Sequence, residues 1–290
     1  MKFEVISDKV GFCEGPVFCQ DGSIIVTSIS DGCLYKTVNN RTTRFALLGG
    51  GPNGAVEAAD GRIYVAQSGL YIDHPGGAFV TKDGVPRTSP AVQVVSPDGS
   101  FTDLQAGPVS PNDLAFGPDG YLYVSDPTRQ PSRADGRLWR YDIASGQVEQ
   151  VARMDWYCNG VAFSTETDCF YVADTRSGRI LRFRLDDPRT EKAEVFIQME
   201  RNVPDGFAFD VEGNLICATV AEARDPGGAG CLQVWSKEGK HLDTIEVSGK
   251  PYVTNVAIGA DGEMVVTDST SGRLLRGQWH CGGLPLHPFR

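Results

Sequence analysis

Residues 112–126 read Asn-Asp-Leu-Ala-Phe-Gly-Pro-Asp-Gly-Tyr-Leu-Tyr-Val-Ser-Asp, and this stretch decides the fold of the chain. A polar residue, Asn112, precedes a short apolar run, and the dipeptide Asp119-Gly120 follows seven residues later. A second run, Leu-Tyr-Val at residues 122–124, is rich in strand-forming side chains. Because Asp-Gly favours a tight reversal of the chain, the stretch predicts two antiparallel strands joined by a turn.

The same pattern occurs six times along the chain. We call the polar residue that opens each repeat its anchor, and the anchors are Glu14, Asn53, Asn112, Asn159, Asp205 and Thr254. Successive anchors are 39, 59, 47, 46 and 49 residues apart, which is typical of the four-stranded blades of a propeller. Most repeats also contain a second glycine-bearing turn that leads into a third strand, such as Arg-Leu-Trp-Arg at residues 137–140.

Helical periodicity is missing from the sequence, since apolar residues do not recur at about 3.6 residues over any long stretch. The predicted fold class is therefore all-β, with residues 1–290 forming a single six-bladed β-propeller domain. The run Phe-Glu-Val-Ile at residues 3–6 is expected to form the outer strand of the last blade, beside residues 274–275, and so to close the ring.

Charge and composition exclude several classes of partner. The 37 acidic and 27 basic residues give a net charge of −10, which argues against a nucleic-acid partner. No apolar run approaches the ~18 residues that span a bilayer, and residues 1–7 lack the apolar stretch of a signal peptide. The 8 cysteines include no Cys-x-x-Cys pair, which favours reduced thiols. We therefore expect a cytoplasmic protein with no membrane partner, and the sequence leaves its oligomeric state open.

Propeller topology places the anchors at one mouth of the central channel. Each anchor precedes the first, innermost strand of its blade, so all six are expected to surround the channel there. The connections between the second and third strands reach the same mouth, and three of them are long, at residues 70–90, 127–135 and 221–229. Long loops over one concave face predict a pocket for a small-molecule substrate.

The anchors comprise two carboxylates, three amides and one hydroxyl, which are all oxygen donors. Such a set suits a hard divalent cation, Ca²⁺ first and Mg²⁺ or Mn²⁺ behind it. An alternative is that Asn and Asp are turn formers where one repeat meets the next, and for Asn53 alone this reading is favoured. Glu14 is a rare residue in turns, so the set as a whole favours a metal site.

The ordered motifs resemble the senescence-marker-protein, gluconolactonase and luciferin-regenerating-enzyme family, whose relatives include diisopropyl fluorophosphatase and bacterial lactonases. The resemblance covers the chain and rests on Cys13-Glu-Gly-Pro-Val-Phe, Ser110-Pro-Asn-Asp-Leu-Ala-Phe, Asn159-Gly-Val-Ala-Phe, Pro204-Asp-Gly-Phe-Ala-Phe-Asp and Val253-Thr-Asn-Val-Ala-Ile. It implies one divalent cation, often Ca²⁺ or Zn²⁺, at the channel mouth. The implied ligands are Glu14, Asn112, Asn159 and Asp205, with Asp205 also the base or nucleophile. Ser110 stands where sugar-lactone hydrolases of the family often carry Arg, which leaves the identity of the lactone open.

The predicted activity is metal-dependent hydrolysis of a lactone. A cation would polarise the carbonyl oxygen, and attack would come from water deprotonated by Asp205 or from Asp205 itself, with Glu14 and Asp113 the next candidates for the base. The candidate substrate contacts are Asn53, Tyr71, His74, Asp113 and Arg129, of which Tyr71, His74 and Arg129 have solvated loop positions as the alternative reading. No Gly-x-Ser-x-Gly motif supports a serine hydrolase.

Two other functions stay open at this point. The chain could hydrolyse another cyclic carbonyl compound or a phosphotriester, or it could be a non-catalytic propeller whose metal is structural. Cys13 and Cys158 directly precede Glu14 and Asn159, so they are expected near the mouth as reactive thiols, with small packing residues as the equal alternative.

Overall fold

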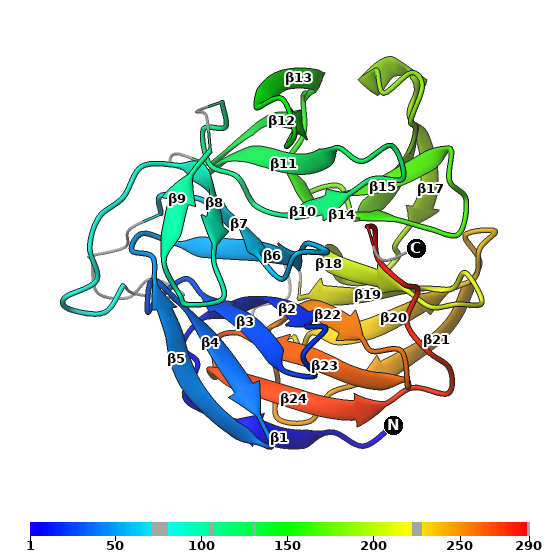
Figure 1. Cartoon of the computed structure of the whole chain (residues 1–290). Coiled ribbons are helices and arrows are strands. Elements are labelled where there is room, and N and C mark those ends of the chain that lie inside the picture. The colour runs from blue at the N-terminus through cyan, green and yellow to red at the C-terminus, as the bar shows by residue number, and fades with distance from the viewer. Residues whose placement is uncertain (71–80, 105–106, 130–131, 222–227, 289–290) are drawn as a thin grey trace.

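The computed structural model describes residues 1–70, 81–104, 107–129, 132–221 and 228–288. Within these residues, six four-stranded sheets surround a central axis, and consecutive strands in each sheet are antiparallel neighbours (Figure 1). The described residues contain a single short 3₁₀ helix, η1 (Thr190–Lys192), and no α-helix. The prediction of an all-β, six-bladed propeller is confirmed.

Each blade runs from an innermost strand at the channel to an outermost strand at the rim. In that order, the first two blades are β2 (Cys13–Phe18), β3 (Ile24–Ser28), β4 (Cys33–Val38) and β5 (Arg41–Leu47), then β6 (Pro52–Glu57), β7 (Ile63–Gln67), β8 (Ala91–Val95) and β9 (Phe101–Asp103). The next two are β10 (Leu114–Phe116), β11 (Leu122–Arg129), β12 (Ser132–Asp142) and β13 (Gln147–Met154), then β14 (Cys158–Phe163), β15 (Cys169–Asp174), β16 (Arg179–Arg184) and β17 (Glu194–Gln198). The last two are β18 (Val203–Phe209), β19 (Leu215–Val220), β20 (Cys231–Trp235) and β21 (His241–Glu246), then β22 (Val253–Ile258), β23 (Glu263–Asp268), β24 (Arg273–Gln278) and β1 (Glu4–Ser7).

The ring is closed by the N-terminal strand. β1 pairs with β24 in antiparallel register, with Glu4 opposite Arg276 and Val5 opposite Leu275. The last blade thus takes three strands from the C-terminal end of the chain and one from the N-terminal end, as the sequence predicts. This pairing covers the outer edge of β24, which would otherwise present unpaired backbone groups.

The apolar core lies between neighbouring blades. Between blades 3 and 4, for example, Tyr123 packs against Phe163 and Phe170 with ring centroids 5.4 and 5.3 Å apart. The two strands that meet at this interface belong to different sheets, so each blade is held by its neighbours. The channel-facing ends of the innermost strands are consequently fixed on a rigid frame.

A buried aspartate at the end of the second strand recurs in three blades. Asp126, Asp174 and Asp268 are fully buried, and each is paired with the arginine opposite it on the third strand. Asp126 also accepts hydrogen bonds from the backbone amides of Val109 and Ser110. Since Ser110 lies two residues before Asn112, this ion pair fixes the backbone that leads into the third anchor.

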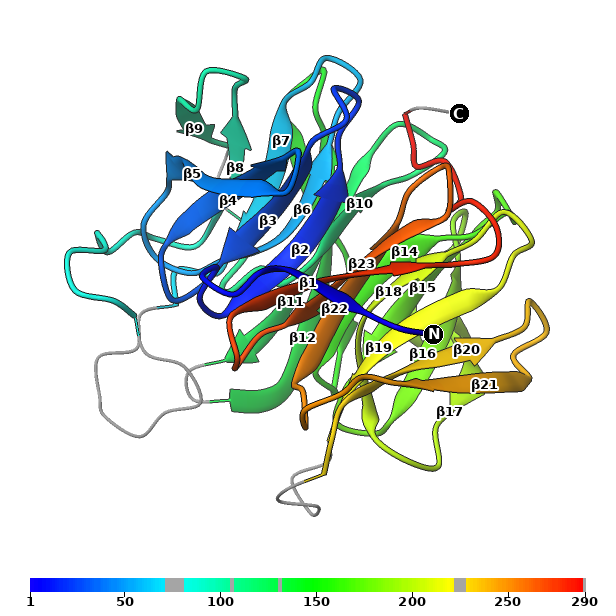
Figure 2. The same ribbon diagram turned by 90° about the horizontal axis from the view of Figure 1, so that it is seen from below.

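The side view shows two different faces of the ring. The hairpin of β11 and β12 and the C-terminal segment (residues 279–288) lie on opposite faces (Figure 2). The sequence predicts a loop at residues 127–135, whereas in the structure the two strands continue to pair as far as Arg129 and Ser132. That part of the predicted loop is therefore a projecting β-hairpin.

Candidate functional site

The innermost strands β2, β6, β10, β14, β18 and β22 surround the channel (Figure 1), and the anchors lie at or just before the starts of these strands. Five anchors lie within the first four residues of β2, β6, β14, β18 and β22, and Asn112 lies two residues before β10. In these five strands the pairing register is broken beside the anchor, between Glu14 and Val17 in β2 for example. Such bulges twist a strand locally and redirect a side chain, which is how a strand end comes to face the channel.

Glycines make room for polar side chains in the channel. Glycine follows the anchor in four blades, as Gly15, Gly54, Gly160 and Gly206, and the other two carry Asp113 and Asn255. A Cβ atom on Gly206 would lie 2.3 Å from Cγ of Asn255, and one on Gly54 would lie 2.3 Å from Oδ1 of Asp113. The glycines therefore admit the two longer side chains that neighbouring blades contribute.

Glu14 is held in place by hydrogen bonds. Its carboxylate is buried, and Oε2 accepts hydrogen bonds from the backbone amide of Gly15 at 3.1 Å and from Nδ2 of Asn255 at 3.0 Å. Burial raises the pKa of the Glu14 carboxyl, and the hydrogen bonds from Asn255 and Gly15 oppose this increase. The charge is therefore confined to a fixed place beside the channel.

Asp205 shares this electrostatic environment. Burial first, and then the charge of Glu14, raise the pKa of the Asp205 carboxyl well above its ordinary value, whereas Arg129 lowers it. The side chain of Asn159 also lowers the pKa of this carboxyl group. Glu14, Arg129 and Asp205 come from three different blades, and the influence of the first two charges on Asp205 indicates that the three side chains converge.

The arrangement fits a divalent cation. Two buried carboxylates repel one another across the site, and a cation between them would relieve the repulsion. Nδ2 of Asn159 donates to Oγ1 of Thr175 at 3.0 Å, and this fixes the amide so that its oxygen is left for another partner. The side chain of Asn112 makes no hydrogen bond within the part of the chain that the structure describes. Carboxylate and amide oxygens of this kind are the donors that Ca²⁺ prefers.

Thr254 differs from the other anchors. Its hydroxyl is buried and takes part in hydrogen bonds with Ser269 and with Thr267, the latter at 2.9 Å. The hydroxyl therefore has structural partners, and the last blade contributes Asn255 to the channel in its place. Asn53 is buried in β6 at the equivalent position of blade 2.

Arg129 is a cation whose charge acts on both carboxylates. It lies at the end of β11, and its charge lowers the pKa of both Glu14 and Asp205. Its Nε atom is buried and has no hydrogen-bond partner among the described residues. A buried guanidinium N–H without an acceptor is suited to a ligand oxygen.

Aromatic residues lie beside the charged groups. Burial raises the pKa of Tyr157, and it raises that of Tyr252 to about 12, with the charge of Asp205 contributing to both. The ring of Phe12 lies 6.1 Å from that of Tyr252, next to Ile29 and Leu70. Tyr252 and Phe12 were not among the residues predicted from the sequence, although both lie two residues before an anchor, as Tyr157 does. That shared position is the signal that identifies them.

Other predicted site residues have different outcomes. Asp113 accepts hydrogen bonds from the backbone amides of Val161 and Leu114 at 3.0 and 2.9 Å, and its charge acts on Asp205. It thus lies inside the channel, close to the predicted centre. Tyr71 and His74 lie outside the residues that the structure describes.

The expectation that Cys13 and Cys158 are reactive thiols at the mouth is wrong. Both are fully buried in the apolar clusters between blades, which is the alternative that the sequence left open. Burial raises the pKa of Cys158 to about 12 and that of Cys13 further still. The reason is strand alternation, because the residue next to a channel-facing anchor points into the blade.

A wide cavity continues from these polar groups towards the opposite face of the ring. It has a volume of about 870 Å³, begins beside Gly15, Asp113 and Asn255, and is lined further along by apolar side chains such as Phe116. Residues 283–287 of the C-terminal segment form part of its wall. The polar centre therefore lies at one end of the channel and an apolar cavity at the other.

Comparison with known proteins places these features in context. A family model described as "SMP-30/Gluconolactonase/LRE-like region" matches residues 12–270. The gluconolactonase of Zymomonas mobilis is 24% identical over 90% of this chain and 76% of that protein, and lactonase drp35 of Staphylococcus epidermidis is 22% identical over 84% and 72%.

A solved structure has the same fold. It is that of a calcium-binding protein, regucalcin, from Agrobacterium tumefaciens, which aligns at a TM-score of 0.75 with 21% identity, covering 99% of this chain and 96% of that one. Within the described residues, no helix has the length and apolar character required to cross a membrane.

Proposed function

Because the chain belongs to the SMP-30/gluconolactonase/LRE-like family, we propose that it hydrolyses a lactone with the help of one divalent cation. The observation that carries the proposal is the convergence of Glu14 and Asp205 at the channel mouth. Their two buried negative charges repel each other, and a cation between them would offset this repulsion. Relatives named gluconolactonase and lactonase support the reaction class. A calcium-binding structural relative supports Ca²⁺ as the first candidate, ahead of Zn²⁺, Mg²⁺ and Mn²⁺.

The proposed ligands are Glu14, Asn112, Asn159 and Asp205. When bound, the cation supplies polarisation of the substrate carbonyl and stabilisation of the oxyanion that develops on attack. Glu14 brings one full negative charge, and its hydrogen bonds to Gly15 and Asn255 fix Oε2. The bond between Asn159 and Thr175 holds the amide in one orientation. These side chains are therefore positioned before any substrate arrives.

Asp205 is the proposed base or nucleophile. The same burial and the same Glu14 charge that raise its pKa make its carboxylate a better proton acceptor than an exposed aspartate. It would take a proton from the attacking water, or attack the carbonyl carbon itself and form an acyl intermediate that water then hydrolyses. Asn159, whose side chain lowers the pKa of the Asp205 carboxyl group, is proposed to orient it for either step.

Substrate contacts are proposed on the mouth side of these groups. Arg129 has a buried N–H available for a substrate oxygen, and Tyr157 and Tyr252 form a wall that excludes water from the reacting carbonyl. Asp113, which lines the channel cavity, and Asn53, which is buried in β6, are further candidates. Such a site takes a small molecule with a ring of modest size.

A panel of lactones tests the proposal. Acid release is followed with a pH indicator, with Ca²⁺, Mn²⁺ or Zn²⁺ added, and again after EDTA. At least one lactone should be hydrolysed, with activity lost on chelation and restored by metal. At saturating metal, Asp205→Asn should lower kcat by about 100-fold or more, because it removes the base. Glu14→Gln should instead raise the metal concentration required.

Controls and contrary outcomes are straightforward to define. Glu191→Gln, in the exposed helix η1, removes a carboxylate away from the channel and should leave activity unchanged. Full activity in EDTA would refute the metal role. Turnover of a phosphotriester but of no lactone would favour that alternative, and metal binding without any turnover would favour a non-catalytic propeller. If Asp205→Asn keeps kcat, Asp205 is only a ligand, and Glu14 and Asp113 become the candidates for the base.

A further inference from the structure

A second group of metal-ligating side chains lies far from the anchors along the chain. Asp210 and Glu212 lie in the turn between β18 and β19, and His280 and Cys281 follow β24. We call these four residues the tail cluster. One carboxylate oxygen, imidazole nitrogen or sulfur atom from each lies within 4.8 Å of those of the other three.

Asp210 is fully buried, and it holds the turn between β18 and β19 against the segment that follows β24. Its Oδ1 accepts the backbone amides of Glu212 and Asn214 at 3.0 and 2.8 Å. Its Oδ2 accepts Nδ2 of Asn214 at 2.9 Å and Nε1 of Trp279 at 3.0 Å. Each carboxylate oxygen therefore already has two donors. Asp210 is best described as a positioning residue, which fixes the turn and the segment beside it.

Backbone contacts reinforce this arrangement. The amide of Val211 donates to the carbonyl of Gly282 at 3.0 Å, and Asp210 and Gly283 form an antiparallel bridge. These contacts flank Glu212 on one segment and Cys281 on the other. The donor atoms are consequently brought together by the frame of the protein, before any ion binds, and not by flexible side chains alone.

The donors themselves are one carboxylate, one imidazole and one thiol. Nε2 of His280 lies 3.4 Å from Oε2 of Glu212. Within the described residues, Glu212 forms no ion pair with a lysine or an arginine. A mixed set of oxygen, nitrogen and sulfur donors suits Zn²⁺, which binds Cys, His and carboxylate ligands in tetrahedral sites. We propose that Glu212, His280 and Cys281 bind Zn²⁺, with Asp210 positioning them and water completing the coordination.

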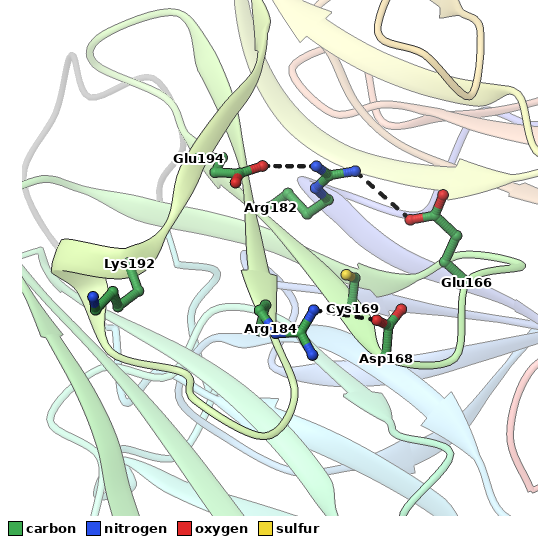
Figure 3. A pocket seen from close by; sticks show the side chains of 7 residues that line it. All are labelled: Glu166, Asp168, Cys169, Arg182, Arg184, Lys192 and Glu194. Carbon is green, nitrogen blue, oxygen red and sulfur yellow. Dashed lines mark hydrogen bonds and ion pairs between the residues drawn. The ribbon is translucent and has the colours of Figure 1, made fainter.

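A comparison within the same protein shows what distinguishes this cluster. Figure 3 shows Glu166, Asp168 and Cys169 in a pocket on blade 4, where the donor types are similar. There Arg182 lies 3.8 Å from Glu166, and Arg184 lies 3.4 Å from Asp168. Guanidinium groups already neutralise these carboxylates, and no histidine is present among the three. The tail cluster has the imidazole and lacks such cations in the described residues.

Zinc at this place would secure the C-terminal segment. Binding releases the thiol proton of Cys281 to solvent, because the thiolate is the form that coordinates metal. The ion would then link blade 5 to the residues after β24, and residues 283–287 of that segment line the 870 Å³ cavity. The proposed role is therefore structural, and it is independent of the anchors, whose donors are all oxygen.

Cobalt binding to the full-length protein tests the assignment directly. Co²⁺ substitutes for Zn²⁺, and a thiolate ligand gives a near-ultraviolet sulfur-to-cobalt charge-transfer band that an all-oxygen site cannot produce. We expect this band on addition of Co²⁺ and its loss when Zn²⁺ is added. Cys281→Ser should abolish the band, and His280→Ala and Glu212→Gln should each weaken Co²⁺ binding by about tenfold or more.

Two matched variants separate the tail cluster from its competitors. Cys169→Ser removes the cysteine of the blade 4 pocket, and Glu14→Gln disables the proposed channel centre, so both should keep the band. His280 is exposed, so His280→Ala should fold normally even if Cys281→Ser does not. The proposal is overturned if no band forms at saturating Co²⁺, if Cys281→Ser keeps the band, if His280→Ala leaves the affinity for Co²⁺ unchanged, or if Glu14→Gln removes the band.

Discussion

The ionisation of Asp113 should make the metal-free protein less stable as the pH rises. Burial raises the pKa of this carboxyl to about 7, and the charge of Glu14 contributes, while hydrogen bonds from Val161 and Leu114 act in the opposite direction. In the unfolded chain the same group has a pKa near 3.8. The folded state therefore holds the proton more tightly, and the stability that this provides is lost as the pH rises through 7.

The size of the effect follows from the shift. Between pH 4.5 and 7 the folded protein keeps a proton that the unfolded chain has lost, which lowers the free energy of unfolding by about 1.4 kcal/mol per pH unit, or about 3 kcal/mol in all. Part of the Asp113 side chain faces the channel, so water there makes this an upper value. The amide that replaces the carboxyl in the Asp113→Asn variant cannot ionise. The unfolding free energy of the variant minus that of the parent should thus increase by up to about 3 kcal/mol from pH 4.5 to 8.

Urea denaturation in EDTA at a series of pH values measures this difference. An asparagine accepts only one of the two backbone hydrogen bonds, which costs about 1–3 kcal/mol at every pH and cancels when two pH values are compared. Asp83→Asn, on the surface, controls for the removal of one negative charge. If the unfolding free energy of the variant minus that of the parent stays constant or decreases as the pH rises, the Asp113 carboxyl is not held in the interior as the structure indicates.

Three further predictions concern the frame and the thiols. Asp126→Ala should lower the free energy of unfolding by about 3–5 kcal/mol in urea titrations, because it removes the buried partner of Arg137 and the acceptor of the Ser110 amide, and a loss below 1 kcal/mol would contradict this. Gly206→Ala would place a Cβ atom 2.3 Å from Cγ of Asn255, so we expect calorimetry to show weaker binding of metal at the channel, and unchanged affinity would argue against that contact. Cys13 and Cys158 should remain unmodified when the folded protein is treated with iodoacetamide, and peptide mapping that finds either one labelled would disprove their burial.

The fold could be predicted because its signal is local and repeated. Each blade carries its own anchor and turn within one short stretch, so six independent copies of the pattern support one interpretation. The strand pairing of residues 127–129 with residues 132–136 was missed for the opposite reason. A stretch that contains two prolines, a serine and an aspartate has the composition of a loop, and only its pairing through Arg129 and Ser132 makes it part of a sheet.

The site was predictable to the extent that it is encoded by position along a strand. The anchors occupy equivalent positions in their repeats, and for this reason the sequence alone predicts that Glu14, Asn159 and Asp205 lie close together. Strand alternation also would have placed Cys13 in the core, had it been applied to the neighbour of an anchor. The tail cluster could not be found in this way, since its two segments are about 70 residues apart and meet through tertiary contacts alone.

The anchor ring is asymmetric, and the asymmetry gives the site a direction. The proposed ligands come from blades 1, 3, 4 and 5, whereas the hydroxyl of Thr254 in the last blade is already hydrogen-bonded to Ser269 and Thr267. Tyr252 and Phe12 lie on that same side, two residues before Thr254 and Glu14. A substrate of the proposed hydrolase would therefore direct its carbonyl oxygen to the cation held by these ligands, and its apolar part to the aromatic rings on the other side. Because Thr254 is engaged within its own blade, we propose that the last blade contributes to substrate choice through Tyr252, whose ring offers apolar contact.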